Sequence, residues 1–255
     1  MPAEVSLFVC LKDNYGVLLH DPATGATAAI DAPEAAPVEA ALKARGWKLT
    51  DILVTHHHAD HTDGIPALKR THGCRVVAPQ EVSAKYSFVD ETVSEGGKIK
   101  VGDLTGNVID TPGHTAGHIS YWFHDEALAF VGDTLFSIGC GRVIEGTPEM
   151  MWTSLKKLRD LPDNTEIYCG HEYTLANIKF ALTIEPNNEA LKARAKEAEQ
   201  EVAAKRPTIP TMIGDEKKEN PFLRADTAEV AASIGMNGMP AAQVFAEIRA
   251  RKNKF

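Results

Sequence analysis

The 255-residue sequence predicts an α/β protein, in which layers of mixed strands are covered by helices and a helical C-terminal part follows. Short apolar runs alternate with segments of helical periodicity over the first 170 residues. Several of these runs end directly in a histidine or an aspartate, and only helical periodicity continues after His171. With 44% hydrophobic residues, the chain can form one large core and a smaller appended domain.

Strands are expected where apolar and β-branched residues are bounded by turn residues such as Asp13-Asn14-Tyr15. The expected strands cover residues 5–9, 16–19, 27–30, 52–54, 101–109, 120–123, 128–131 and 167–169. Helices are expected over residues 38–45, after Asp63-Gly64 and from Thr147-Pro148-Glu149. The C-terminal helices are predicted from the apolar positions Leu175, Ile178 and Leu182, then Leu191, Ala195, Ala198 and Val202, and finally Val244, Phe245 and Ile248.

Residues 55–61 read Thr-His-His-His-Ala-Asp-His and directly follow the apolar run 52–54. Imidazole and carboxylate groups are ligands for zinc, iron and manganese, so this density of both predicts a metal site. If the segment after Val54 stays extended, His56 and His58 point to one side and His57 to the other. The remaining histidines His20, His72 and His124 are expected at the surface or in turns.

Three further apolar runs end in a glycine followed by a metal-binding side chain, namely His114, Asp133 and His171. Glycine allows the sharp backbone turn that would bring these side chains to a shared centre. The seven candidate ligands are too many for one tetrahedral zinc and favour two divalent ions that share a carboxylate. Zinc is the first expectation, with iron and manganese as alternatives. The candidates are His56, His58, Asp60, His61, His114, Asp133 and His171.

This ligand pattern resembles the metallo-β-lactamase superfamily. The resemblance implies a four-layer αββα sandwich with a binuclear site at one edge. It implies that His56, His58 and His114 hold one ion, that Asp60, His61 and His171 hold the other, and that Asp133 bridges them.

Within the superfamily, the whole chain looks most like glyoxalase II, the hydroxyacylglutathione hydrolases. The residues similar to that family are 13–15, 55–61, 113–118, 132–136, 139–142, 145–147, 170–174, 220–222 and the basic tail 249–252. The resemblance implies that Arg142 and Tyr173 contact glutathione, while Arg249 and Lys252 bind its glycine carboxylate. Many members of the family have an aromatic residue where this chain has Val143-Ile144, so a substrate contact there is expected to be lost.

The resemblance implies a catalytic domain over residues 1–172 and a helical substrate-binding domain over residues 173–255. The implied reaction is hydrolysis of an S-(2-hydroxyacyl)glutathione, such as S-D-lactoylglutathione, to D-lactate and glutathione in methylglyoxal detoxification. The implied catalytic groups are Asp60 and Asp133 together with a hydroxide that bridges the metals, and no serine or cysteine nucleophile is needed. The alternatives are a lactonase or β-lactamase, a persulfide dioxygenase, and a protein whose metals are only structural.

The formal charge of −8 argues against a nucleic-acid partner, which usually requires a basic surface. No apolar run is long enough to cross a membrane, and the start of the chain lacks the pattern of a secretory signal. The four cysteines are too sparse for a disulfide framework. A cytoplasmic enzyme is therefore expected, with a small-molecule glutathione thioester as its partner and with a monomer as the default oligomeric state.

Overall fold

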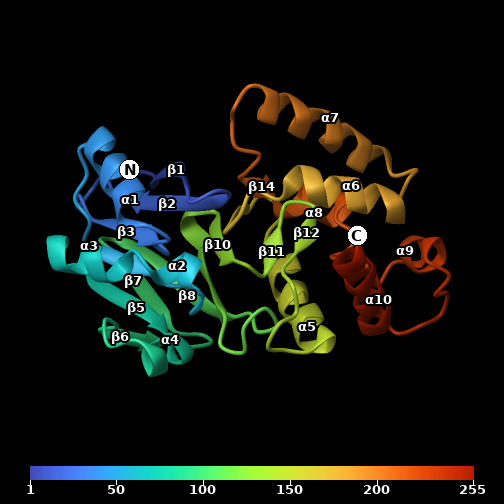
Figure 1. Cartoon of the computed structure of the whole chain (residues 1–255), viewed down its shortest axis with the longest axis horizontal. Helices are drawn as coiled ribbons and strands as arrows, with labels where there is room; N and C mark the ends of the chain where they lie inside the picture. The colour runs from blue at the N-terminus through green and yellow to red at the C-terminus, as the bar shows by residue number, and fades with distance from the viewer. The chain divides into compact units, whose positions relative to one another are not determined.

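The computed structural model describes all 255 residues, which form two compact units (Figure 1). The first unit comprises residues 1–110 and 117–132, and the second comprises residues 111–116 and 133–255. The division into domains at residues 172 and 173 stays a prediction.

The first unit contains a six-stranded sheet in the order β1-β2-β3-β4-β5-β6. Strands β1 to β3 pair antiparallel, whereas β3 to β6 pair parallel. Because β3 and β4 are parallel neighbours, the residues that follow them, Asp31 and Thr55, emerge at the same edge of the sheet. The six strands are β1 (Glu4–Cys10), β2 (Asn14–His20), β3 (Thr27–Ile30), β4 (Asp51–Leu53), β5 (Arg75–Pro79) and β6 (Glu91–Val93).

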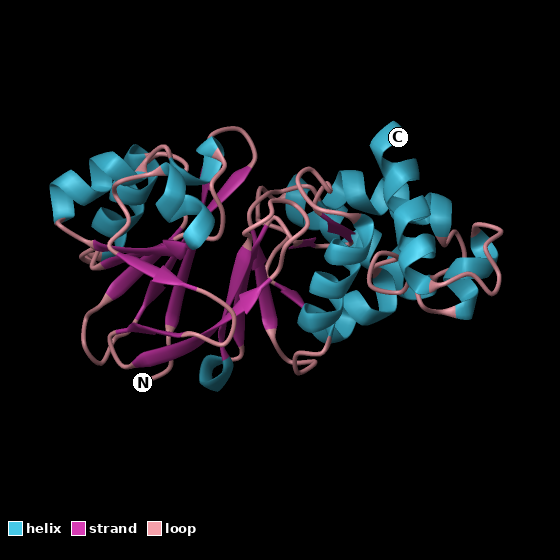
Figure 2. Cartoon of the chain, turned by 90° about the horizontal axis from the view of Figure 1, so that it is seen from below, coloured by secondary structure: helices cyan, strands magenta, loops and turns pink.

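Helices cover one face of this sheet (Figure 2). The side chains of the strands point alternately toward these helices and to the opposite face. Ile52 of β4 joins the core beneath the helices, whereas the equally buried Leu53 points to the opposite face. Gly46, in the left-handed conformation, ends the first helix where the sequence predicts it. The helices are α1 (Ala35–Arg45), α2 (Ala59–Thr62), α3 (Ile65–His72) and α4 (Gln80–Lys85).

The second sheet of this unit is antiparallel, in the order β10-β9-β8-β7. The single strand expected over residues 101–109 is wrong, because Gly102 turns the chain there with a φ of 59° and separates two strands of a hairpin. Tyr121 of β9 donates a hydrogen bond of 2.7 Å to the carbonyl oxygen of Val54, directly after β4. The elements are β7 (Lys98–Val101), β8 (Leu104–Asp110), β9 (Ile119–Phe123), the 3-10 turn η1 (His124–Glu126) and β10 (Leu128–Gly132).

The second unit is mainly helical. Thr147 caps α5 by accepting a hydrogen bond from the backbone nitrogen of Met150, as its sequence predicts. The expectation of helix alone after His171 is wrong in one place, because β14 pairs antiparallel with β13. The elements are β11 (Leu135–Phe136), β12 (Gly139–Cys140), α5 (Pro148–Arg159), β13 (Glu166–Cys169), α6 (Thr174–Ile184), α7 (Glu189–Ala203), β14 (Thr211–Met212), α8 (Ile213–Glu219), α9 (Ala228–Ser233) and α10 (Ala241–Lys254).

Helices α6 and α7 lie side by side and share a small core (Figure 1). The stripe predicted for α6 is partly wrong: Ile178 is buried, but Leu175 is exposed, and Ala181 and Ile184 complete the buried face. The apolar positions predicted for α10 are all buried. No helix of the structure is long and apolar enough to cross a membrane.

Candidate metal centre

The candidate ligands fall into two groups, one in each unit. The first group contains His56, His58, Asp60 and His61, and the second contains His114, Asp133 and His171.

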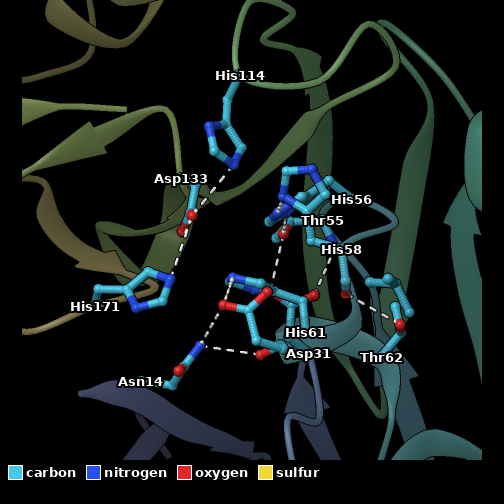
Figure 3. Close-up of polar contacts among 12 residues, drawn as sticks. Asn14, Asp31, Thr55, His56, His58, His61, Thr62, His114, Asp133 and His171 are labelled. Carbon is cyan, nitrogen blue, oxygen red and sulfur yellow. Dashed lines mark hydrogen bonds and ion pairs between the residues drawn. The ribbon is translucent and has the colours of Figure 1, made fainter. Parts of the chain in front are cut away.

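The sequence suggested an extended histidine-rich segment in the first group, but the segment is not extended throughout. Residues 54–58 have no regular structure, and the helical turn α2 begins at Ala59. The prediction that His57 points away is confirmed, since its Nδ1 pairs with the Glu81 carboxylate. Nε2 of His56 and Nδ1 of His58 lie 3.2 Å apart, so these two imidazoles present nitrogen atoms to a common point (Figure 3).

Asp31 is a buried carboxylate that organises this group from the end of β3. It accepts hydrogen bonds from the backbone nitrogen of Thr55 at 2.7 Å and from the Thr55 hydroxyl at 2.8 Å. Its Oδ2 also lies 2.8 Å from Nδ1 of His61. A carboxylate only accepts hydrogen bonds, so Nδ1 of His61 carries the proton and Nε2 presents a lone pair.

The same network fixes His56. The Thr55 hydroxyl donates its proton to Asp31, and it therefore accepts from Nδ1 of His56, 2.9 Å away. Nε2 of His56 then presents a lone pair as well. The ligand atoms of Asp31, His56 and His61 all lie within 4.8 Å of one another.

The second group is centred on Asp133, which follows β10. Its Oδ2 lies 3.4 Å from Nε2 of His114 and 3.3 Å from Nε2 of His171 (Figure 3). Nδ1 of His114 lies 3.0 Å from the carbonyl oxygen of Arg142 and donates to it, so the neutral imidazole presents the lone pair of Nε2 toward the carboxylate. Two electron pairs at this separation repel each other unless a cation lies between them, which makes this set suited to a metal.

Glycines give two of the three ligands in the second group their predicted backbone turns, whereas Gly170, before His171, has no positive φ. Gly113, just before His114, has a φ of 142°, and a Cβ there would lie 2.9 Å from the Cα of Met151. Gly132, just before Asp133, has a φ of 46°. Both conformations are strained for any residue with a side chain.

The predicted carboxylate anchor lies on α10 and consists of two cations. Arg249 is 6% exposed and donates to the carbonyl oxygen of Cys140 at 2.9 Å. Lys252 is half-buried and donates to the carbonyl oxygen of Ala176 at 2.8 Å. Neither forms an ion pair with an acidic side chain. Burial and the repulsion of Arg249 lower the pKa of Lys252 to about 8. Two neighbouring cations without an acidic partner suit an anion.

The other predicted substrate residues lie near the second ligand group in the chain. The Tyr173 ring stacks on the His171 ring with centroids 4.8 Å apart, and it is 37% exposed. Arg142 is exposed, and Ile144, at the position that differs from the family, is 56% exposed. Cys140 is buried, and burial raises the pKa of its thiol to about 11, so it is neutral.

Comparisons with known proteins agree with this arrangement. A family model described as the metallo-beta-lactamase superfamily matches residues 4–171, and one described as the hydroxyacylglutathione hydrolase C-terminus matches residues 172–255. The chain is 63% identical to the hydroxyacylglutathione hydrolase of Nitrobacter winogradskyi, over 100% of both chains. The chain belongs to the hydroxyacylglutathione hydrolase family. It is also 61% identical to the enzyme of that name from Rhodopseudomonas palustris, over 99% of both chains.

Among solved structures, ETHE1 from Myxococcus xanthus is similar to this family member, with a TM-score of 0.67 and 27% identity over 99% of this chain and 98% of that chain. The α/β sandwich of the superfamily, followed by a helical C-terminal region, is therefore the fold of this chain, as the sequence predicts. The superfamily and the histidine and aspartate groups together indicate that the chain binds divalent metal.

Sequence reasoning missed Asp31 as a functional residue. The signal was present, because Asp31 directly follows the predicted strand 27–30, as the predicted ligands follow theirs. Asp31 does not match the pattern of the predicted ligands, because it lies outside the histidine cluster and no glycine precedes it.

Proposed function

We propose that this chain is a metal-dependent thioester hydrolase that cleaves S-(2-hydroxyacyl)glutathione, such as S-D-lactoylglutathione, to a 2-hydroxy acid and glutathione. The observation that carries the proposal is the identity of about 60% to hydroxyacylglutathione hydrolases over the full chain. That observation favours this reaction over the lactonase, β-lactamase and dioxygenase alternatives. The proposed setting is methylglyoxal detoxification in the cytoplasm.

We propose two ions, zinc first, with iron or manganese as alternatives. His56, His58 and His114 are assigned to one ion, and Asp60, His61 and His171 to the other. Asp133 is assigned as the bridge. When bound, divalent ions bring the pKa of water close to neutrality and polarise the thioester carbonyl.

The residues of the chain have separate roles in this proposal. Asp31 accepts a hydrogen bond from the protonated Nδ1 of His61, so that Nε2 of the same ring is available as a ligand. Asp60 accepts a hydrogen bond from the attacking water and orients it toward the carbonyl carbon. Arg249 and Lys252 hold the glycine carboxylate of glutathione, while Arg142 and Tyr173 contact its backbone.

The test is to measure loss of thioester absorbance with S-D-lactoylglutathione, together with a metal count on the same sample. Turnover with two ions per chain is the expected result. A fully loaded preparation that leaves the thioester intact would contradict the proposed reaction. One with a single ion per chain would contradict the ligand assignment.

A further inference from the structure

Asn14 belongs to the segment 13–15, a motif to which neither the sequence nor the proposed reaction assigns a role. It is the first residue of β2, paired with Cys10 of β1, and is 4% exposed. Its carboxamide nitrogen Nδ2 lies 3.0 Å from the backbone oxygen of Asp60 and 3.2 Å from Oδ2 of the same residue. A buried strand residue therefore contacts a candidate ligand 46 positions later in the chain.

The chemistry of the contact fixes the orientation of the carboxamide. Both Asp60 oxygens only accept hydrogen bonds, so the amino group of Asn14 must face them with its two N–H donors. The reversed amide would place its own oxygen against a carboxylate and a carbonyl oxygen. One side chain thus holds the backbone and the carboxylate of Asp60 together.

The Asp60 side chain is less enclosed than that of His61. Asp60 lies in α2, which has four residues, and the preceding N-cap residue, His58, makes no capping hydrogen bond through its side chain. The Asp60 side chain is 43% exposed, whereas that of His61 is 2% exposed and is held by Asp31. A half-exposed carboxylate in a short helical turn can adopt several rotamers, and ordering it costs conformational entropy.

We propose that Asn14 is a positioning residue for Asp60. It holds Oδ2 of Asp60 on the side of His61, 3.9 Å from Nε2 of that residue. The remaining lone pairs of the carboxylate would then have a fixed direction when Asp60 serves as a ligand. Hydrogen bonds to a ligating carboxylate orient the ligand and raise metal affinity in this way. This inference rests on the proposed function, because it assumes that Asp60 and His61 serve one of two ions.

The test compares metal retention in Asn14→Asp, Asn14→Ala and the native chain as loaded holoenzymes. Each is equilibrated with increasing concentrations of a chelator, and the ions retained per chain are counted. Asn14→Asp keeps the side-chain shape but places an oxygen against Oδ2 of Asp60. We expect the affinity for the ion assigned to Asp60 and His61 to fall by about 10-fold to 100-fold. The affinity for the other ion should change little. Asn14→Ala removes the donors without adding repulsion, so a smaller fall is expected.

The matched control is Asn107→Asp, because Asn107 also lies in a strand of the first unit and its side chain forms no hydrogen bond. It should retain both ions like the native chain. Retention of both ions by the Asn14 variants with native affinity would overturn the inference. Equal loss of both ions, or loss of the folded state in both variants, would also overturn it, since either result assigns Asn14 a general structural role. If the native chain itself holds fewer than two ions, the proposed binuclear site fails, and the inference fails with it.

Discussion

The two ligand groups are built in different ways. In the first unit, four candidate ligands lie within residues 56–61. The Asp31 carboxylate and the Thr55 hydroxyl, just after neighbouring strands, fix which ring nitrogen of His56 and His61 carries a proton. In the second unit, each ligand comes from a separate loop. Glycines with positive φ precede His114 and Asp133, and a backbone carbonyl oxygen accepts from His114. In the first group, a substitution can remove one supporting hydrogen bond and leave the ligands in place. In the second group, the supports are backbone features, so substitutions of the ligands themselves are the more direct test.

The largest effect is expected from Asp133→Ala in the second group. Removing this carboxylate takes away the partner of both His114 and His171, and in the proposed site it removes the bridge between two ions. We expect both ions to be lost and turnover of the thioester to fall by more than about 100-fold, beyond the range for residues outside the ligand set. Metal analysis that finds two retained ions would rule out the bridging assignment.

Asp31→Asn tests the support of the first group and should have a smaller effect. Asparagine tolerates the positive φ of 55° at this position, so the backbone should be kept. Both oxygens of Asp31 accept hydrogen bonds, so the amino group of asparagine would face a donor in either orientation: the backbone nitrogen of Thr55, or the Thr55 hydroxyl and Nδ1 of His61. The network that orients the His61 imidazole would therefore be weakened. We expect metal affinity to fall by about 10-fold to 100-fold in a chelator competition. Asp63→Asn, at an exposed position after α2, should match the native chain; an equal fall there would refute the role of Asp31.

Lys252→Ala extends the comparison from ligands to the basic anchor of the second unit. A charge-assisted hydrogen bond to a half-buried cation contributes about 1.5 kcal/mol, so KM for the glutathione thioester should rise by about tenfold. The value of kcat should change less, because the contact is remote from the reacting carbonyl. Lys254→Ala, an exposed lysine two residues later, should leave KM unchanged. Equal effects of the two substitutions would count against a specific carboxylate anchor.

The smallest effect is expected in the pH dependence of the same anchor. Burial and the nearby Arg249 lower the pKa of Lys252 to about 8, so its charge is present below this pH and is lost above it. We therefore expect kcat/KM for the anionic substrate to decline severalfold as the pH rises from about 7 to 9. Lys252→Arg keeps its charge over this range and should remove that part of the decline. An unchanged profile in the variant would assign the decline to another group.

The parts of the fold set by local chemistry could be predicted from the sequence. Helix α1 ends at Gly46 and α5 begins at its Thr147 cap, because each boundary depends on a single residue type. The hairpin at Gly102 does not follow from apolar residues alone, but Gly102-Asp103 is a turn signal that separates its two strands. The short strand β14 was also missed, because it is stabilised by pairing with β13 rather than by its own two residues.

In the candidate site, the sequence predicts the candidate ligands but not the side chains that hydrogen-bond to them. The contact of His57 with Glu81 agrees with the predicted orientation, although residues 54–58 do not form the strand that alternation assumes. His20 was expected at the surface, yet it is buried and stacked on Trp47 at 4.3 Å, a contact between segments that periodicity does not register. The contacts that Asp31 and Asn14 make are likewise formed only where segments distant in the sequence meet, so the sequence shows their positions but not their partners.

The position of Arg249 has a practical consequence. Its guanidinium is nearly enclosed, faces the Phe222 ring at 5.2 Å, and has a carbonyl oxygen and the Asn253 amide as its acceptors. A permanent positive charge in such surroundings favours a small carboxylate that reaches it. Under the proposed role of Arg249 in holding the glycine carboxylate, acetate or citrate in an assay buffer should act as competitive inhibitors. Kinetic constants measured in those buffers would then understate the affinity for the substrate.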